Sequence, residues 1–137
     1  MTYVPLERLI ETSDIISLHV PLLDSTRHML CGEEMKRMKD GAIIINTARG
    51  GLVDDEALVR AVRSGKLAGA GLDGVEREPL PAGDPLLTEP NIIVTPHIGG
   101  GTADIGDVII PMLVQDIRNF AAGNKPEHVV NWKFLDI

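Results

Sequence analysis

The sequence predicts an α/β protein with a doubly wound parallel sheet of about four strands, followed by a long C-terminal helix. Short apolar runs alternate with amphipathic segments along the 137 residues, which is the pattern of strands joined by right-handed helical crossovers. The apolar runs are rich in Ile, Val, Leu and Ala, as expected of strands buried in a parallel sheet. Hydrophobic residues make up 44% of the chain, which is enough to form the core of one domain.

The first part of the chain contains two expected strands and two short helices. Pro5 fits the first turn of a helix, and Pro21 ends the strand that precedes it. Met35 and Met38 are three residues apart and therefore share one face of a helix. The expected elements are a helix at 5–10, a strand at 15–20, a helix at 32–38 and a strand at 42–46.

The third expected helix has clear sequence signals at both ends. Asp54 is a typical N-cap residue, and the two acidic residues that follow it favour the positive end of the helix dipole. Val53 and Leu58 are expected to pack across the N-cap as a hydrophobic staple. The helix is expected to run to Ser64 and to end at Gly65.

Two further strands complete the expected sheet. A strand of small residues is expected at 68–72, with Asp73 directly after it. The last strand, at 92–95, is closed by Pro96. The segment between these strands, at 74–90, is rich in proline and acidic residues and is expected to be a loop.

The last long segment, at 102–122, repeats apolar residues with helical spacing and is expected to be a helix. Pro111 lies inside this segment and is expected to kink or break the helix, because proline removes a backbone hydrogen bond. Gly123 is expected to stop the helix. Residues 129–132 are expected to form a short strand or an arm.

Composition and charge argue against several classes of partner. The net charge of −7 argues against binding to nucleic acid or to anionic membranes. No apolar run approaches the roughly 20 residues that a membrane helix needs, and the N-terminus lacks the pattern of a signal peptide. Cys31 is the only cysteine, so an internal disulfide is excluded and a reducing, cytoplasmic location is expected. No metal site is predicted.

Three of the expected strand ends lead to side chains that form a useful chemical set. Arg49 follows the second strand, Glu78 lies in the loop after the third, and His97 follows the fourth. The carboxyl ends of parallel strands meet at one edge of a sheet, so these side chains can converge there. Arginine matches a carboxylate in bidentate fashion, and histidine exchanges a proton near neutral pH. A carboxylate orients the imidazole, so the set favours proton transfer at a carbon next to a substrate carboxylate.

Taken alone, the turn at residues 48–51 fits an ordinary surface arginine beside two glycines equally well. The motifs around it, however, form an ordered set: residues 13–22 (SDIISLHVPL), 46–54 (NTARGGLVD), 70–73 (AGLD), 78–81 (EPLP) and 95–99 (TPHIG). With them the chain resembles the D-isomer-specific 2-hydroxyacid dehydrogenases, the family of phosphoglycerate, glyoxylate and D-lactate enzymes, over roughly residues 3–131. The resemblance implies that the sheet is part of a Rossmann-like, dinucleotide-binding domain.

The resemblance also implies roles for individual residues. Arg49 is implied to bind the carboxylate of a small 2-hydroxy or 2-keto acid, and His97 to be the acid/base that exchanges the hydroxyl proton. Glu78 is implied to be the carboxylate partner of His97, with Glu76 as a rival. NAD or NADP is the implied cofactor, and Asp73 is expected near its nicotinamide end. The residues implied to line the cofactor cleft are Val20, Pro21, Thr47, Ala48, Arg49, Asp73, His97 and Gly99.

The remaining histidines and one threonine are assigned with less support from the motifs. His19 and Thr26 are weaker candidates for the site. His28 and His128 carry no motif and are expected to be surface residues.

In this family a Gly-x-Gly-x-x-Gly turn after the first strand holds the pyrophosphate, and no such turn is expected in these 137 residues. The glycines at 69–71 belong to an expected strand, and those at 99–101 come after the last strand. We therefore expect residues 1–100 to form the second half of a dinucleotide-binding domain, and residues 101–137 to form a helix and tail that cross to an absent substrate domain. We expect weak cofactor binding and little activity from this truncated chain alone. The alternatives are a non-catalytic, dimerising remnant and one half of a split enzyme. The unpaired edge of the first strand and the apolar helix face are expected to associate, giving a homodimer or a higher assembly.

Overall fold

The computed structural model describes residues 2–131 and divides the chain into two compact units, Met1–Gly99 and Gly100–Ile137. The first unit holds all four strands that the structure describes, and the second holds the last helix. This division, between Gly99 and Gly100, lies one residue before the expected boundary between residues 100 and 101.

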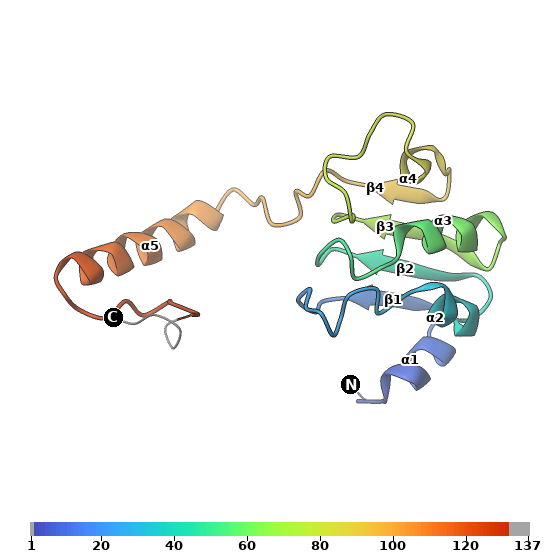
Figure 1. Ribbon diagram of the computed structural model, residues 1–137, viewed down its shortest axis with the longest axis horizontal. Coiled ribbons are helices and arrows are strands. Elements are labelled where there is room, and N and C mark those ends of the chain that lie inside the picture. Colours follow the sequence, from blue (N-terminus) through green and yellow to red (C-terminus); the bar gives the residue numbers. More distant parts are fainter. Residues whose placement is uncertain (1, 132–137) are drawn as a thin grey trace. The chain divides into compact units, whose positions relative to one another are not determined.

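The first unit is built on a parallel sheet of four strands (Figure 1). The strands are β1 (Ile15–Leu18), β2 (Ala42–Asn46), β3 (Leu67–Leu72) and β4 (Ile92–Val94), and they lie side by side in that order. Ile16, Ile44, Ala70 and Ile92 pair with one another in a row across the sheet. All four are buried, so this row forms the centre of the core. The arrangement confirms the predicted α/β fold.

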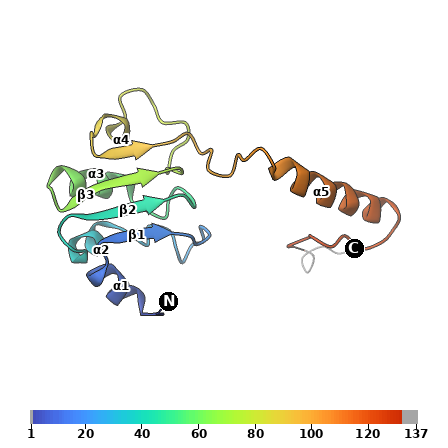
Figure 2. The same cartoon turned by 180° about the vertical axis from the view of Figure 1, so that it is seen from behind.

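The helices of this unit are α1 (Leu6–Thr12), α2 (Gly32–Arg37), α3 (Asp55–Arg63) and α4 (Pro85–Thr88). Helices α2 and α3 lie in front of the strands in Figure 1 and behind them in Figure 2, so they cover one face of the sheet. On the strands, residues that point away from these helices are less buried: Ile15 and Ile93 are 61% and 70% exposed. Strand β1 forms one edge of the sheet, as expected.

Helix α3 begins and ends where its sequence signals predict. The carboxylate of Asp54 accepts a hydrogen bond from the N–H of Ala57 at 2.9 Å, which caps the helix. Val53 and Leu58, the predicted staple, are both fully buried. Gly65 follows the last turn with a φ of 75°, a conformation that favours glycine. Local signals and core packing therefore agree on the bounds of this helix.

The segment at 74–90, which is expected to be a loop, contains the short helix α4, so that prediction is wrong over these residues. Asp84 caps α4 by accepting the N–H of Leu86 at 3.0 Å, and Pro85 occupies the first helical turn. Leu86 is buried. An Asp-Pro pair before two leucines is a helix-start signal, but the high proline and acidic content of the segment masks it.

The second unit contains α5 (Ile105–Ala121) and the segment that follows it. Helix α5 runs through Pro111 as one element, so of the two expected effects a break is wrong, and a kink stays a prediction. A proline removes one backbone hydrogen bond, and a helix of 17 residues keeps the others. Gly123 has a φ of 75° just beyond the end of the helix, as expected. The short strand expected at the tail is absent from residues 129–131, and Trp132 lies outside the described residues.

Candidate active site at the carboxyl edge of the sheet

The turn after β2 is held by a buried asparagine. Asn46 is 1% exposed; its Nδ2 donates to the carbonyl of Arg49 at 2.8 Å, and its Oδ1 accepts from the N–H of Ala48 at 3.1 Å. The guanidinium of Arg49 donates to the carbonyl of Ala48 at 2.7 Å, and Arg49 itself is an exposed residue. Asn46 thereby fixes the backbone from which the Arg49 side chain projects.

Gly50 lets this turn pack directly against the loop after β3. A Cβ atom at Gly50 would lie 1.8 Å from the carbonyl oxygen of Val75. A Cβ atom at Gly74 would lie 2.9 Å from the backbone nitrogen of Gly50. Neither position has room for a side chain. The turn that carries Arg49 and the loop that carries Glu78 are therefore in direct backbone contact.

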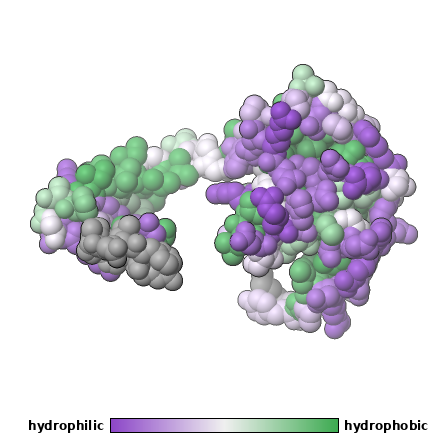
Figure 3. All heavy atoms as spheres, in the orientation of Figure 1, coloured by the Kyte–Doolittle hydropathy of each residue, from purple (hydrophilic) through white to green (hydrophobic). Residues whose placement is uncertain are grey.

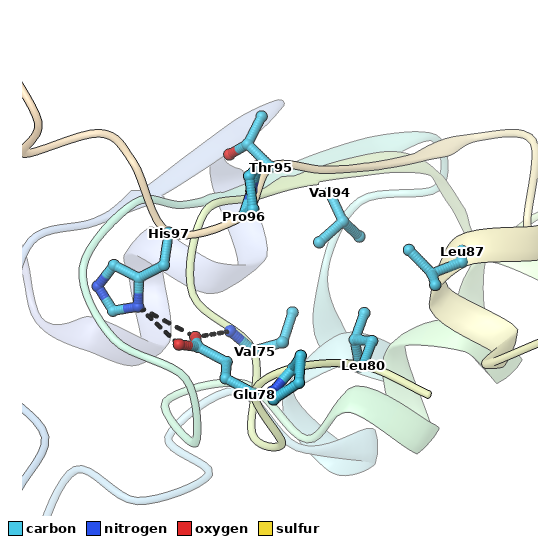
Figure 4. Close-up of a pocket in the computed structure, with 9 residues that line it drawn as sticks. Val75, Glu78, Leu80, Leu87, Val94, Thr95, Pro96 and His97 are labelled. Carbon is cyan, nitrogen blue, oxygen red and sulfur yellow. Dashed lines mark hydrogen bonds and ion pairs between the residues drawn. The ribbon is translucent and has the colours of Figure 1, made fainter. Parts of the chain in front are cut away.

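Glu78 and His97 form a hydrogen-bonded pair at this edge of the sheet (Figure 4). Nδ1 of His97 lies 2.9 Å from Oε2 and 3.1 Å from Oε1 of Glu78, and Oε1 also accepts the N–H of Val75 at 3.1 Å. The bond with His97 has the largest effect and, together with the bond from Val75, holds the pKa of Glu78 below its usual value. An ionised carboxylate only accepts hydrogen bonds, so Nδ1 of His97 carries the proton. Nε2 lies on the side of the ring that is turned away from Glu78 (Figure 4).

Glu76, the rival partner, bonds a different histidine. Its Oε1 lies 2.8 Å from Nε2 of His28 and accepts from Nη1 of Arg27 at 3.0 Å. His28 is half-buried in this cluster, so it is not the plain surface residue that the sequence suggests. His128 in the second unit is exposed, as expected, and its Nδ1 lies 3.0 Å from Asp116.

Asp73, at the end of β3, binds the turn after β4. It is buried, and its carboxylate accepts from the hydroxyl of Thr95 and from the N–H groups of Ile98 at 3.0 Å and Gly99 at 2.7 Å. These bonds lower the pKa of Asp73, and the bond from Thr95 has the largest effect. A Cβ atom at Gly99 would lie 2.7 Å from Oδ2 of Asp73, so a side chain there would have to displace this carboxylate. Asp73 therefore shapes the turn that carries His97, and its place beside a nicotinamide ring stays a prediction.

Two concavities border these residues. One, of about 620 Å³, is lined by His19, Val20, Pro21, Leu22, Ala48 and Arg49. It brings together four of the residues predicted to line the cofactor cleft: Val20, Pro21, Ala48 and Arg49. The other, of about 490 Å³, lies beside the Glu78–His97 pair and has a mainly apolar lining that includes Leu80, Leu87 and Val94 (Figure 4). Thr47 is exposed and lines neither concavity.

The weaker candidates lie in the loop after β1 or at its start. His19 lines the larger concavity, and its Nε2 is 2.8 Å from Oγ of Ser17. Thr26 donates to the carbonyl of Pro21 and accepts from the N–H of Leu23, both at 2.8 Å, so its hydroxyl shapes this loop. Within residues 2–131, no group of three or more His, Cys, Asp or Glu side chains could hold a metal ion. No helix in the same range is long and apolar enough to cross a membrane.

Residues 1–99 match the family model described as D-isomer specific 2-hydroxyacid dehydrogenase, NAD binding domain. The chain belongs to this family. It is 42% identical over 135 residues to glyoxylate reductase of Korarchaeum cryptofilum, a match that spans 98% of this chain and 41% of that relative. The chain therefore spans about two fifths of the length of the curated relatives that it matches. The resemblance inferred from the ordered motifs is confirmed.

Solved structures of dehydrogenases of this kind share the fold. The crystal structure of D-lactate dehydrogenase with NAD⁺ from Lactobacillus jensenii is 37% identical, with a TM-score of 0.85 over 94% of this chain and 43% of that one. The crystal structure of a D-isomer specific 2-hydroxyacid dehydrogenase from Xanthobacter autotrophicus Py2, in complex with NADPH and MES, is 39% identical. Its TM-score is 0.75, and the match covers 87% of this chain and 48% of that one. The prediction of NAD or NADP as the cofactor is thus confirmed for the family.

Two parts of this candidate site are not predicted from the sequence. Asn46 reads as the last residue of a strand, although an asparagine just before a turn is a common donor and acceptor for local backbone groups. The pairing of Glu76 with Arg27 and His28 joins residues that are 48 or 49 positions apart, and no local pattern signals it.

Proposed function

We propose that these residues supply the catalytic groups of an NAD(P)-dependent oxidoreductase that interconverts small D-2-hydroxy acids and 2-keto acids. The observation that supports this most directly is the hydrogen bond between Glu78 and His97. The loop that carries Glu78 is in backbone contact with the turn that carries Arg49. Membership of the family supports the class of reaction, since its members include a glyoxylate reductase and a D-lactate dehydrogenase.

His97 is the proposed acid/base. Because Nδ1 donates to Glu78, the opposite nitrogen, Nε2, is the atom that exchanges a proton with substrate. During oxidation of a 2-hydroxy acid, Nε2 takes the hydroxyl proton, and the ionised Glu78 stabilises the imidazolium that forms. During reduction of a 2-keto acid, the imidazolium returns that proton to the oxygen.

Arg49 is the proposed carboxylate-binding residue. Its planar guanidinium offers parallel N–H donors that match the two oxygens of a carboxylate. A cation held next to the neighbouring carbonyl also stabilises negative charge on that oxygen. The bonds from Asn46 and the glycine contact at Gly50 hold the turn, so the guanidinium is presented from a fixed backbone.

The residues beside Arg49 fit a nicotinamide cofactor. The larger concavity has an apolar wall that includes Val20, Pro21 and Ala48, which suits one face of a flat ring. NAD or NADP, when bound, accepts the hydride from a 2-hydroxy acid or supplies it to a 2-keto acid. The one Gly-x-Gly-x-x-Gly sequence, at 69–74, lies mostly on β3 and not in a turn that opens a helix, so we expect weak cofactor binding and slow turnover by this chain alone.

We also propose that the chain forms a homodimer or a higher assembly in the cytoplasm. Apolar side chains cover much of α5 (Figure 3), and large exposed apolar patches commonly mark interaction surfaces. The residues of α5 that are more than half exposed include Val108, Ile109, Ile110, Leu113, Ile117 and Phe120. Light scattering at high micromolar concentration tests this, and a stable monomer contradicts it. A non-catalytic remnant would associate in this way without binding any substrate analogue.

Binding of oxalate, an unreactive mimic of a 2-keto acid, tests the site without requiring turnover. Titration into the ¹⁵N-labelled chain is expected to shift the signals of Arg49 and His97, and the absence of such shifts contradicts the proposal. NADH oxidation in the presence of glyoxylate or pyruvate is expected to be slow in the parent chain and lost in His97→Asn. The exposed histidine of the second unit provides the control, His128→Asn, which should keep the parent rate. A rate that survives His97→Asn would show that another group moves the proton.

A rate that rises when a second chain carrying a Gly-x-Gly-x-x-Gly turn is added favours the split-enzyme alternative.

A further inference from the structure

Two histidines share an uncommon backbone conformation. Among the described residues, His28 and His97 are the only non-glycine residues with positive φ, at 51° and 54°. Residues with a Cβ atom disfavour positive φ, so contacts around each histidine must hold its backbone in this conformation. Each ring bonds a glutamate of the same loop after β3: His28 bonds Glu76 at 2.8 Å, and His97 bonds Glu78 at 2.9 Å.

Glu76 joins this loop to two other elements. Its carboxylate accepts from Arg27 and His28, which both lie in the loop after β1. Its backbone N–H donates to Oδ2 of Asp55 at 2.8 Å, in the first turn of α3. The backbone N–H of His28 donates to the carbonyl of Gly51 at 2.7 Å, which ties the loop after β1 to the turn after β2.

The backbone of Val75 links Glu76 to the Glu78–His97 pair. Val75, the preceding residue, donates its N–H to Glu78 at 3.1 Å. The carbonyl of Val75 lies against Gly50, beside Arg49. A shift of the backbone at Glu76 therefore moves an atom that bonds Glu78 and an atom that packs against the arginine turn.

We propose that Glu76 is a positioning residue that, through Arg27 and His28, holds the loop after β3 so that Glu78 meets His97. The inference rests on the proposed function of the Glu78–His97 pair. The side chains of Arg27 and Glu76 are 55% and 36% exposed, and exposed ion pairs contribute little to global stability. Removing Glu76 should therefore change the geometry at His97 more than it changes the unfolding of the chain.

Histidine ring ¹⁵N NMR on the 137-residue chain tests this. In the parent, the neutral ring of His97 should carry its proton on Nδ1, because Glu78 accepts from that atom. In Glu76→Ala, the ring nitrogens are expected to move toward the Nε2–H form, which free imidazole side chains prefer. Exchange of the Val75 amide hydrogen should speed up by roughly three- to tenfold, the effect of losing about one ordinary hydrogen bond.

Glu56→Ala is the matched control, because Glu56 lies on α3 with its side chain 89% exposed and pairs with Arg60 at 3.5 Å. It should leave the His97 signals unchanged. Glu76→Gln, which keeps an acceptor oxygen, should cause a smaller change than Glu76→Ala. If Glu76→Ala does not fold, Arg27→Ala removes one of its two partners and should move the His97 signals part of the way.

A parent-like His97 ring in folded Glu76→Ala, or in folded Arg27→Ala where the first variant does not fold, overturns the inference. So does a loss of stability without any change at His97, since that outcome indicates only a structural role. The readout needs neither ligand nor turnover. A chain that fails to bind oxalate but shows the tautomer change supports the positioning role and refutes the proposed function. A chain that binds oxalate, but whose His97 ring does not change in Glu76→Ala, supports the proposed function and refutes the positioning role.

Discussion

Replacing Asn46 with alanine is expected to loosen the turn that carries Arg49 while leaving the sheet in place. Asn46 is 1% exposed and bonds the carbonyl of Arg49 at 2.8 Å and the N–H of Ala48 at 3.1 Å. Each hydrogen bond contributes about 0.5–1.5 kcal/mol, and a buried polar group left without a partner costs about 1–3 kcal/mol. Water can reach part of this turn, so we expect a loss of about 2–4 kcal/mol in the free energy of unfolding.

Urea unfolding of the parent and of three variants, Asn46→Ala and the two that follow, measures this loss. Asn46→Asp has nearly the same shape and still accepts from the N–H of Ala48, but it points an oxygen at the carbonyl of Arg49. We expect it to destabilise the chain as well, because the donor is replaced by an acceptor. Asn91→Ala is the control at an exposed asparagine, and we expect it to stay within about 0.5 kcal/mol of the parent.

Binding provides a second measurement of the same perturbation. Oxalate affinity is expected to fall in Asn46→Ala and to stay unchanged in Asn91→Ala, because only the first variant releases the turn that carries Arg49. An unfolding free energy for Asn46→Ala within about 0.5 kcal/mol of the parent refutes the reasoning, since other contacts would then hold the turn. Parent-like oxalate affinity in a destabilised Asn46→Ala refutes the link between Asn46 and Arg49.

Three further outcomes are expected. Gly50→Ala should lower the unfolding free energy by about 1–3 kcal/mol or more in urea, because the new Cβ falls 1.8 Å from the carbonyl oxygen of Val75; a parent-like value contradicts the glycine contact. Arg49→Lys should weaken oxalate binding about tenfold by NMR titration, because lysine lacks the planar fork, whereas Arg60→Lys on α3 should not; equal affinities argue against the carboxylate role. The pKa of Glu78 is lowered in the fold, so its contribution to stability is present above the ordinary carboxyl pKa and is lost as pH falls through the folded-state value. Unfolding measured from neutral to acidic pH should therefore show the parent losing stability relative to Glu78→Gln, and parallel curves contradict this.

Elements with short-range signals are the ones that the sequence predicts well. Asp54 and Gly65 bound α3 as expected, because a cap and a positive-φ glycine act on the backbone within a few residues. The meeting of Glu78 with His97 is also predicted, since parallel strands deliver their carboxyl ends to one edge and the ordered motifs select these two residues. Each of these predictions depends on a rule that is independent of the detailed packing.

The features that escape prediction depend on contacts distant in sequence or on competing signals. The pairing of Glu76 with His28 is such a feature, because only the folded positions of the two loops bring these residues together. Pro111 is a helix breaker by local rule, yet α5 continues through it, because a single missing hydrogen bond does not outweigh the favourable turns on either side.

The packing of Gly50 against Val75 has a consequence for substrate binding. The contact is between backbone atoms, so no flexible side chain absorbs a displacement of either loop. If Arg49 shifts to meet a substrate carboxylate, its turn must carry Val75 with it. The N–H of Val75 is bonded to Glu78, so the same shift reaches the carboxylate that orients His97. We therefore expect carboxylate binding and proton exchange to be coupled through this glycine contact, although the two side chains lie on separate loops.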